Sequence, residues 1–73
     1  MEKRPIFSER LIELRKEKGL LQRQLAKDLN ITQSTVSDWE TARSRPNIYT
    51  LISFAKFFDV SADYLLGLKD DYN

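Results

Sequence analysis

The sequence predicts an all-α fold, a compact bundle of five short helices. Apolar residues recur at helical spacing along the chain, and no useful length alternates with a period of two. Breaks at Gly19, Asn30 and Pro46 separate the apolar stretches. Because 73 residues leave room for one core, we expect a single domain over residues 1–73. Its core covers about 6–67, between a frayed, charged N-terminus (residues 1–4) and an acidic C-terminal tail.

The first helix is predicted from an apolar stripe near the start of the chain. Phe7, Leu11 and Leu14 fall at i, i+4 and i+7, which places them on one buried face. Ser8 with the following glutamate is the expected helix start. Basic residues in the last turn favour the helix dipole there, and Gly19 is the expected residue just past the end.

Residues 22–40 predict two short helices joined by a tight turn. The first begins near Leu21 or Gln22, and its inward face carries Leu25, Ala26 and Leu29. Leu21 has no side-chain acceptor for the first free amide groups. We therefore expect this helix to lack about 0.5–2 kcal/mol of N-cap stabilisation.

The second of these helices is expected to follow Thr32, a good N-cap residue. Val36 and Trp39 face inward at i and i+3, and the indole is expected to fill the core or to overfill it and reach the surface. The outward positions hold hydrogen-bonding side chains: Gln33, Ser34, Ser37 and Asp38. A short helix with such a face, held at an angle to its neighbour, is suited to insertion into a DNA groove.

Two further helices complete the predicted bundle. Pro46 and Asn47 end the preceding loop and cap the longer of the two. Val60 closes the next corner, and Ser61 opens a short last helix that ends near Gly67. The longer helix has a core stripe of Leu51, Phe54 or Ala55, and Phe58.

Composition excludes several classes of protein. The chain has no cysteine and no histidine, so disulfides are excluded and the usual zinc ligand sets cannot be built. No apolar run approaches the roughly 20 residues that span a membrane, and no signal-peptide core is present. Paired carboxylates and a glycine-rich phosphate loop are also missing. We expect a cytoplasmic protein that is not an enzyme and needs no metal or cofactor.

Charge is unevenly distributed, although the net charge is only +1. Residues 1–45 carry ten Lys and Arg against seven Asp and Glu, whereas residues 46–73 carry two against four. The basic half contains the two-helix motif. This polarity fits one face turned toward phosphate, although a solvated surface explains it almost as well.

Several stretches resemble the Cro/C1-type (XRE-like) helix-turn-helix family of phage repressors. They are residues 7–20, the motif at 22–40, the loop Trp39-Glu40-Thr-Ala-Arg43-Ser-Arg45-Pro46, and residues 51–67. About 60 of the 73 residues are covered in order and without gaps. The resemblance implies a lambda-repressor-like DNA-binding domain with the helix-turn-helix at helices 2 and 3. Thr41-Ala42 departs from the family's usual Asn-Gly, so helix 3 runs on slightly or ends with strain.

The resemblance also implies which residues contact DNA. Gln33 and Ser34 match positions that reach base edges, and Asp38 can accept from a cytosine amino group although it repels phosphates. Gln22 matches a residue that binds a phosphate and braces Gln33. Arg10 and Arg23 are further candidates for phosphate contact. Contacts with the DNA backbone are expected of Gln22, Thr35, Ser37, Thr41, Arg43 and Arg45. The alternative for each is an ordinary solvated side chain.

Two structural roles complete the expectations. By resemblance, Arg15 and Glu40 form a structural ion pair, in which a guanidinium answers a partly buried carboxylate with two hydrogen bonds. The C-terminal half holds more apolar area than one small core obviously needs, which is typical of an interface. The candidate interface residues are Tyr49, Ile52, Phe57 and Tyr64.

The leading function is sequence-specific binding of double-stranded DNA by a phage or bacterial regulator of the repressor type. A homodimer on a pseudo-palindromic operator supplies affinity, and promoter occlusion is expected because 73 residues leave no separate effector domain. The alternative is a small antirepressor or modulator that forms a heteromeric complex with another phage regulator. Near-zero net charge, a helix 3 face without a cation and aromatic residues in the C-terminal half favour that alternative.

Overall fold

The computed structural model describes residues 5–72, and this part of the chain folds into helices without a strand. The predicted N-terminal fraying at residues 1–4 lies outside the described residues. No helix within 5–72 has the length and apolar character needed to cross a membrane. The all-α prediction is confirmed by the five helices α1 (Ile6–Glu17), α2 (Gln22–Asp28), α3 (Gln33–Glu40), α4 (Ile48–Phe58) and α5 (Ala62–Leu66).

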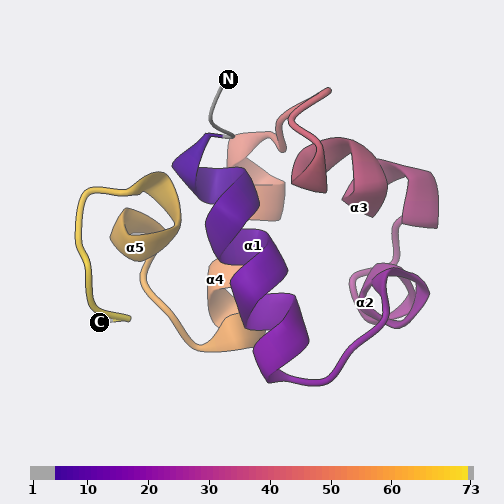
Figure 1. Ribbon diagram of the computed structural model, residues 1–73, viewed down its shortest axis with the longest axis horizontal. Coiled ribbons are helices and arrows are strands. Elements are labelled where there is room, and N and C mark those ends of the chain that lie inside the picture. Colours follow the sequence, from indigo (N-terminus) through magenta and orange to yellow (C-terminus); the bar gives the residue numbers. More distant parts are fainter. Residues whose placement is uncertain (1–4, 73) are drawn as a thin grey trace.

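The first helix, α1, lies at the centre of the bundle. In Figure 1, α2 and α3 lie on one side of α1, α5 and the C-terminus lie on the other, and α4 runs behind it. The α1 helix packs against both α3 and α5, and α4 packs against α5. The two helices of the motif therefore occupy one end of the molecule, away from the C-terminal tail.

Every helix contributes to one apolar core, and Phe54 of α4 lies at its centre with no exposed surface. Its ring meets Trp39 edge-on, with ring centroids 4.9 Å apart and an interplanar angle of 87°, and lies 5.9 Å from the ring of Phe7. The indole of Trp39 is buried. The alternative that it overfills its site and reaches the surface is wrong, because the space beside Phe54 accommodates it.

Three of the predicted caps are confirmed. The side-chain oxygens of Thr32, Asn47 and Ser61 each accept a hydrogen bond from the amide three residues later, at 3.2, 2.9 and 3.1 Å. Each bond satisfies one of the amide groups that a helix start leaves free. The starts of α3, α4 and α5 therefore follow from local sequence.

The start of α1 differs from the prediction. The helix begins at Ile6 after Pro5, whose ring fixes φ near the helical value and has no amide hydrogen to satisfy. Ser8 is buried inside the first turn, and its hydroxyl donates to the backbone oxygen of Trp39 at 2.5 Å. Ser8 is therefore a tie between α1 and the end of α3 rather than a cap.

The end of α3 is strained, which is one of the two predicted alternatives. Ala42 has φ of +64°, a left-handed conformation that suits glycine better than alanine. The amide of Ala42 donates to Trp39 at 3.3 Å and that of Arg43 donates to Asp38 at 2.8 Å, which is the Schellman pattern. This turn holds Arg43 close to the last turn of α3.

The C-terminal tail, residues 67–72, is fastened to α1 and α5. The Tyr72 hydroxyl donates to Glu17 at 2.5 Å, and this hydrogen bond raises the pKa of Tyr72 from 10.0 to about 12. Arg10 donates to the backbone oxygens of Tyr64 and Lys69 and pairs with Asp70 at 3.4 Å. Arg10 was predicted as a weaker phosphate contact. The structure corrects this prediction, because its guanidinium is committed to the tail.

The start of α2 at Gln22 leads to a stability prediction. Leu21 offers no cap, although the Gln24 side chain accepts from the Leu21 amide at 2.7 Å. Leu21→Thr supplies the missing acceptor, so we expect the free energy of unfolding to rise by about 0.5–2 kcal/mol. Thermal denaturation followed by circular dichroism measures this, with Leu21→Ala as the matched variant that shortens the side chain without adding an acceptor. An unchanged melting temperature in Leu21→Thr contradicts the prediction.

Candidate nucleic-acid interface

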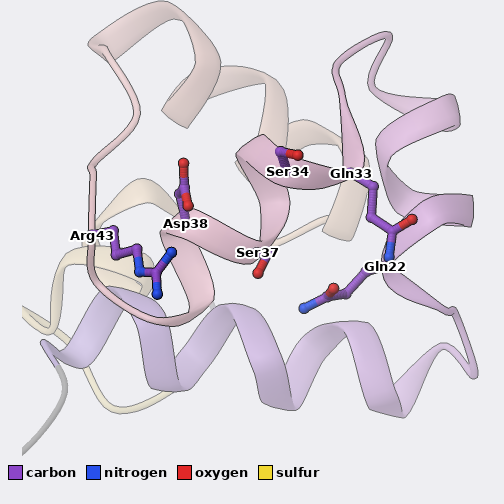
Figure 2. Close-up of a pocket in the computed structure, with 6 residues that line it drawn as sticks. All are labelled: Gln22, Gln33, Ser34, Ser37, Asp38 and Arg43. Carbon is purple, nitrogen blue, oxygen red and sulfur yellow. The ribbon is translucent and has the colours of Figure 1, made fainter.

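An open cavity of about 340 Å³ lies on the outward face of α3. Figure 2 shows its side chains converging from the start of α2, the length of α3 and the loop that follows α3. All the lining residues are polar or charged, with one anion and one cation. The lining residues are Gln22, Gln33, Ser34, Ser37, Asp38 and Arg43.

The face of α3 that lines the cavity points outward because the opposite face of the helix is buried in the core. Val36 has no exposed surface and Trp39 is buried, so α3 cannot turn about its axis without losing the core. Gln33 and Ser34 are exposed at the N-terminal end of the helix. The tail that might have covered them lies beyond α1, beside α5 (Figure 1). The side chains of Gln33 and Ser34 are therefore accessible to a ligand from outside.

A buried ion pair fixes the angle of α3. Glu40 is 5% exposed, and its Oε2 and Oε1 accept from Nε and Nη2 of Arg15 at 2.6 and 3.1 Å. Arg15 also donates from Nη1 to the backbone oxygen of Leu20 at 2.8 Å. The pairing of Arg15 with Glu40 is the one that the family resemblance implied. It joins the last turns of α1 and α3.

Gln22 extends this pair in a way that the sequence did not predict. Its Nε2 donates to Glu40 Oε1 at 2.9 Å, so the side chain is directed inward along the cavity rather than toward Gln33. No hydrogen bond joins Gln22 and Gln33 within residues 5–72, which corrects the predicted brace between them. An ionised carboxylate accepts strongly from a donor within reach, which favours this direction of the Gln22 side chain. Gln22 thereby links α2 to the pair.

Three candidate backbone-contact residues, Thr35, Thr41 and Arg45, lie outside the cavity. Thr35 has its hydroxyl 2.8 Å from that of Thr32, and the Thr41 hydroxyl donates to the backbone oxygen of Ser37 at 2.9 Å. Arg45 is exposed beside a second, more apolar cavity of about 250 Å³ near Pro46. Arg43 is exposed and lines the first cavity. Of the nine main candidates for DNA contact, six are brought together, and Thr35, Thr41 and Arg45 are not; the weaker candidate Arg23 is exposed on α2 and does not line the cavity.

The candidate protein interface is corrected at one position. Tyr49 and Ile52 of α4 are 79% and 43% exposed, and Phe57 is half-buried against Phe58. Tyr64 is only 6% exposed, because the Arg10 guanidinium lies 4.1 Å from its ring centroid and the Tyr72 ring packs against it at 4.9 Å. Tyr64 is therefore a core residue. Ile48, which precedes Tyr49 on α4 and is 65% exposed, was missed as a candidate interface residue.

Sequence reasoning also missed the roles of Ser8 and Arg10. Ser8 lies between Phe7 and Leu11 of the apolar stripe, so its inward direction was a signal that it needs a buried partner. Nothing near Arg10 in the sequence indicates a partner in the tail. Among the described residues, no group of three or more Asp or Glu side chains is arranged to hold a metal ion.

Comparison with known proteins identifies the family. Residues 11–65 match the Helix-turn-helix family model, and the chain belongs to this family in its Cro/C1-type (XRE-like) form. It is 38% identical over 66 residues to the uncharacterized HTH-type transcriptional regulator YobD of Bacillus subtilis (strain 168), covering 90% of this chain and 59% of YobD. It is 42% identical over 61 residues to the HTH-type transcriptional activator BcrR of Enterococcus faecalis, covering 84% of this chain and 30% of BcrR.

A solved structure supports the same conclusion. The P22 c2 repressor, crystallised in complex with a synthetic operator, is 32% identical and superimposes with a TM-score of 0.77 over 82% of this chain and 91% of that one. The fold is therefore that of helix-turn-helix repressor domains. The family consists of transcriptional regulators, in agreement with the prediction that the chain is not an enzyme.

Proposed function

We propose that the protein is a sequence-specific DNA-binding regulator of transcription that inserts α3 into the major groove. The observation that carries the proposal is the polar cavity on α3, where Gln33, Ser34 and Arg43 are exposed while Val36 and Trp39 hold the helix in the core. The P22 c2 repressor, which was crystallised with an operator, shares this fold. A DNA-binding regulator of this kind acts in the cytoplasm.

The residue roles divide into base and backbone contacts. Gln33, Ser34 and Asp38 face base edges, because their side chains line the cavity on the outward face of α3. Arg43 contacts phosphate without reading sequence, since it is an exposed cation at the rim of the same cavity. Phosphate or sugar contacts are also proposed for the other predicted residues: Gln22, Thr35, Ser37, Thr41 and Arg45.

Two copies on a pseudo-palindromic operator would supply useful affinity. A single domain buries little surface on DNA, and half-sites about one helical turn apart suit a symmetric pair. Exposed apolar side chains of α4, at Ile48, Tyr49 and Ile52, offer a surface for the second copy. Promoter occlusion requires only that the bound pair lies over a promoter. Promoter occlusion is proposed here for this chain and is not taken from its relatives, since BcrR is named an activator.

The experiment is a gel-shift titration with duplex DNA that flanks the protein's own gene. We expect the affinity to fall steeply between roughly 50 and 200 mM salt, because binding releases counterions from phosphates. Arg43→Ala should reduce the slope of log affinity against log salt by about one. Lys56→Ala removes an equal charge from the exposed part of α4 and should leave the slope unchanged. The absence of a shift at micromolar protein overturns the proposal.

A second candidate function is that of a modulator that binds another small regulator. The observation in its favour is Tyr49, whose ring is 79% exposed next to Ile48 and Ile52 on α4. A modulator of this kind would form a stable complex with its partner in size-exclusion chromatography, and Tyr49→Ala would weaken that complex. It would show no salt-dependent gel shift on its own.

A further inference from the structure

Asp38 differs from the other side chains of the cavity because it carries a negative charge and forms no ion pair among the described residues. The residue lines the cavity, and Figure 2 shows its side chain extending from α3 apart from the other labelled side chains; within residues 5–72 its carboxylate forms neither an ion pair nor a hydrogen bond. The residue is half-buried in the last full turn of α3. The hydrogen bonds of this residue are made by its backbone: its carbonyl oxygen accepts from the amides of Arg43 and Ser44 at 2.8 and 3.4 Å and from the Thr41 hydroxyl at 3.4 Å. The carboxylate is therefore available to a ligand.

A carboxylate restricts what that ligand can be. An ionised carboxylate only accepts hydrogen bonds, and the phosphates of DNA repel it. In the major groove, donors are the amino groups of cytosine and adenine, whereas guanine and thymine present acceptors. Adenine also has its N7 acceptor beside the amino group, which opposes a carboxylate. Cytosine has no acceptor on this edge and is the base that a carboxylate fits best.

We infer that Asp38 selects a cytosine at one position of each half-site, an inference that rests on the proposed function. The helical register gives the position. Asp38 follows Ser34 by four residues on the same face, which is about 6 Å along the helix axis at 1.5 Å per residue. For α3 lying along the groove, with base pairs about 3.4 Å apart, the cytosine is expected about two base pairs from the position that Ser34 faces.

Arg43 explains how an anion is tolerated so close to DNA. Figure 2 shows its guanidinium at the same end of the cavity as the Asp38 carboxylate. The two side chains together contribute no net charge to the lining, and the backbone bond between them keeps them neighbours. A phosphate that approaches Arg43 is attracted, and this attraction offsets its repulsion by Asp38.

The test is selection from a library of random-sequence DNA duplexes, followed by anisotropy titrations of the selected site and its single base-pair variants. The proteins are wild type, Asp38→Ala, Asp38→Asn and the control Asp71→Asn. The control removes the same charge from the exposed tail, on the far side of α1 (Figure 1). Circular dichroism melts establish that each variant folds. This is expected, because the Asp38 side chain makes no bond among the described residues.

We expect wild type and Asp71→Asn to select the same half-site, with one cytosine whose replacement weakens binding about tenfold. Asp38→Ala should lose the preference at that position and keep it elsewhere. Asp38→Asn should shift the preference toward adenine, which an amide can bind with two hydrogen bonds. Undiminished cytosine preference in Asp38→Ala, or equal weakening at every position, overturns the inference while leaving the proposed function intact. Failure of wild type to enrich any sequence overturns the proposed function and the inference with it.

Discussion

Replacing Glu40 with glutamine should lower the free energy of unfolding by about 3 kcal/mol. The side chains of Glu40 and Arg15 are 6% and 12% exposed, so the pair is largely removed from water. Removal of one partner leaves the other charge desolvated, which typically costs about 3–5 kcal/mol. For a domain of this size, each kcal/mol corresponds to roughly 4–8 °C in melting temperature. The variant should therefore melt more than about 10 °C below wild type, as followed by circular dichroism.

The control for this measurement is Glu13→Gln, which makes the same chemical change at an exposed position of α1. Its melting temperature should stay within a degree or two of wild type, since surface substitutions rarely matter. The Arg15→Met, Glu40→Leu double variant removes both charges and should lose less stability than Glu40→Gln alone. If Glu40→Gln melts within about a degree of wild type, the pair does not hold α3 and this account of the site is wrong.

The parts of the fold that follow from neighbouring residues were predictable from the sequence. Thr32, Asn47 and Ser61 cap helices through amides three residues away, so the chemistry of one short segment decides each start. The inward direction of Val36 and Trp39 follows from helical periodicity. Once these two residues face the core, Gln33, Ser34 and Asp38 must face outward, and the structure brings them to one cavity. Their contact with DNA remains a prediction.

The predictions that were wrong concern residues whose partners lie far away in the sequence. Ser8 reads locally as a helix start, but its hydroxyl binds the backbone of a residue 31 positions later. Tyr64 reads as an exposed aromatic, yet Arg10, 54 positions away, covers its ring. Gln22 is drawn to a carboxylate 18 positions later. Periodicity and capping rules carry no information about such contacts, because they describe only the residues of one turn or one helix.

Replacing Phe54 with alanine should lower the free energy of unfolding by a comparably large amount and should disturb the packing of α3. Phe54 has no exposed surface, and its ring packs against Phe7 of α1, Trp39 of α3 and Phe58 of its own helix. Truncation of a buried phenylalanine costs about 3–5 kcal/mol, because the lost burial adds to the cavity left behind. Small domains have little stability to spare. We expect Phe54→Ala to be largely unfolded near 37 °C and to lose DNA binding at that temperature, measured by circular dichroism and anisotropy.

Phe57→Ala is the matched variant, because it makes the same truncation three residues later on α4 at a half-buried site. The ring centroids of Phe57 and Phe58 are 5.1 Å apart, and the Lys18 ammonium lies near the Phe57 ring. Because Phe57 is only half-buried, its truncation should lower the free energy of unfolding clearly less than that of Phe54. Measurements at low temperature separate the loss of folding in Phe54→Ala from any loss of DNA binding by the folded variant. If the variant refolds at low temperature and binds DNA as wild type does, the other contacts of α3, including the Arg15–Glu40 pair, orient the helix without the Phe54 ring. If the refolded variant still binds poorly, the Phe54 ring is needed to hold Trp39, and the recognition surface depends on packing behind it. Equal losses of stability in both variants would contradict the central position of Phe54.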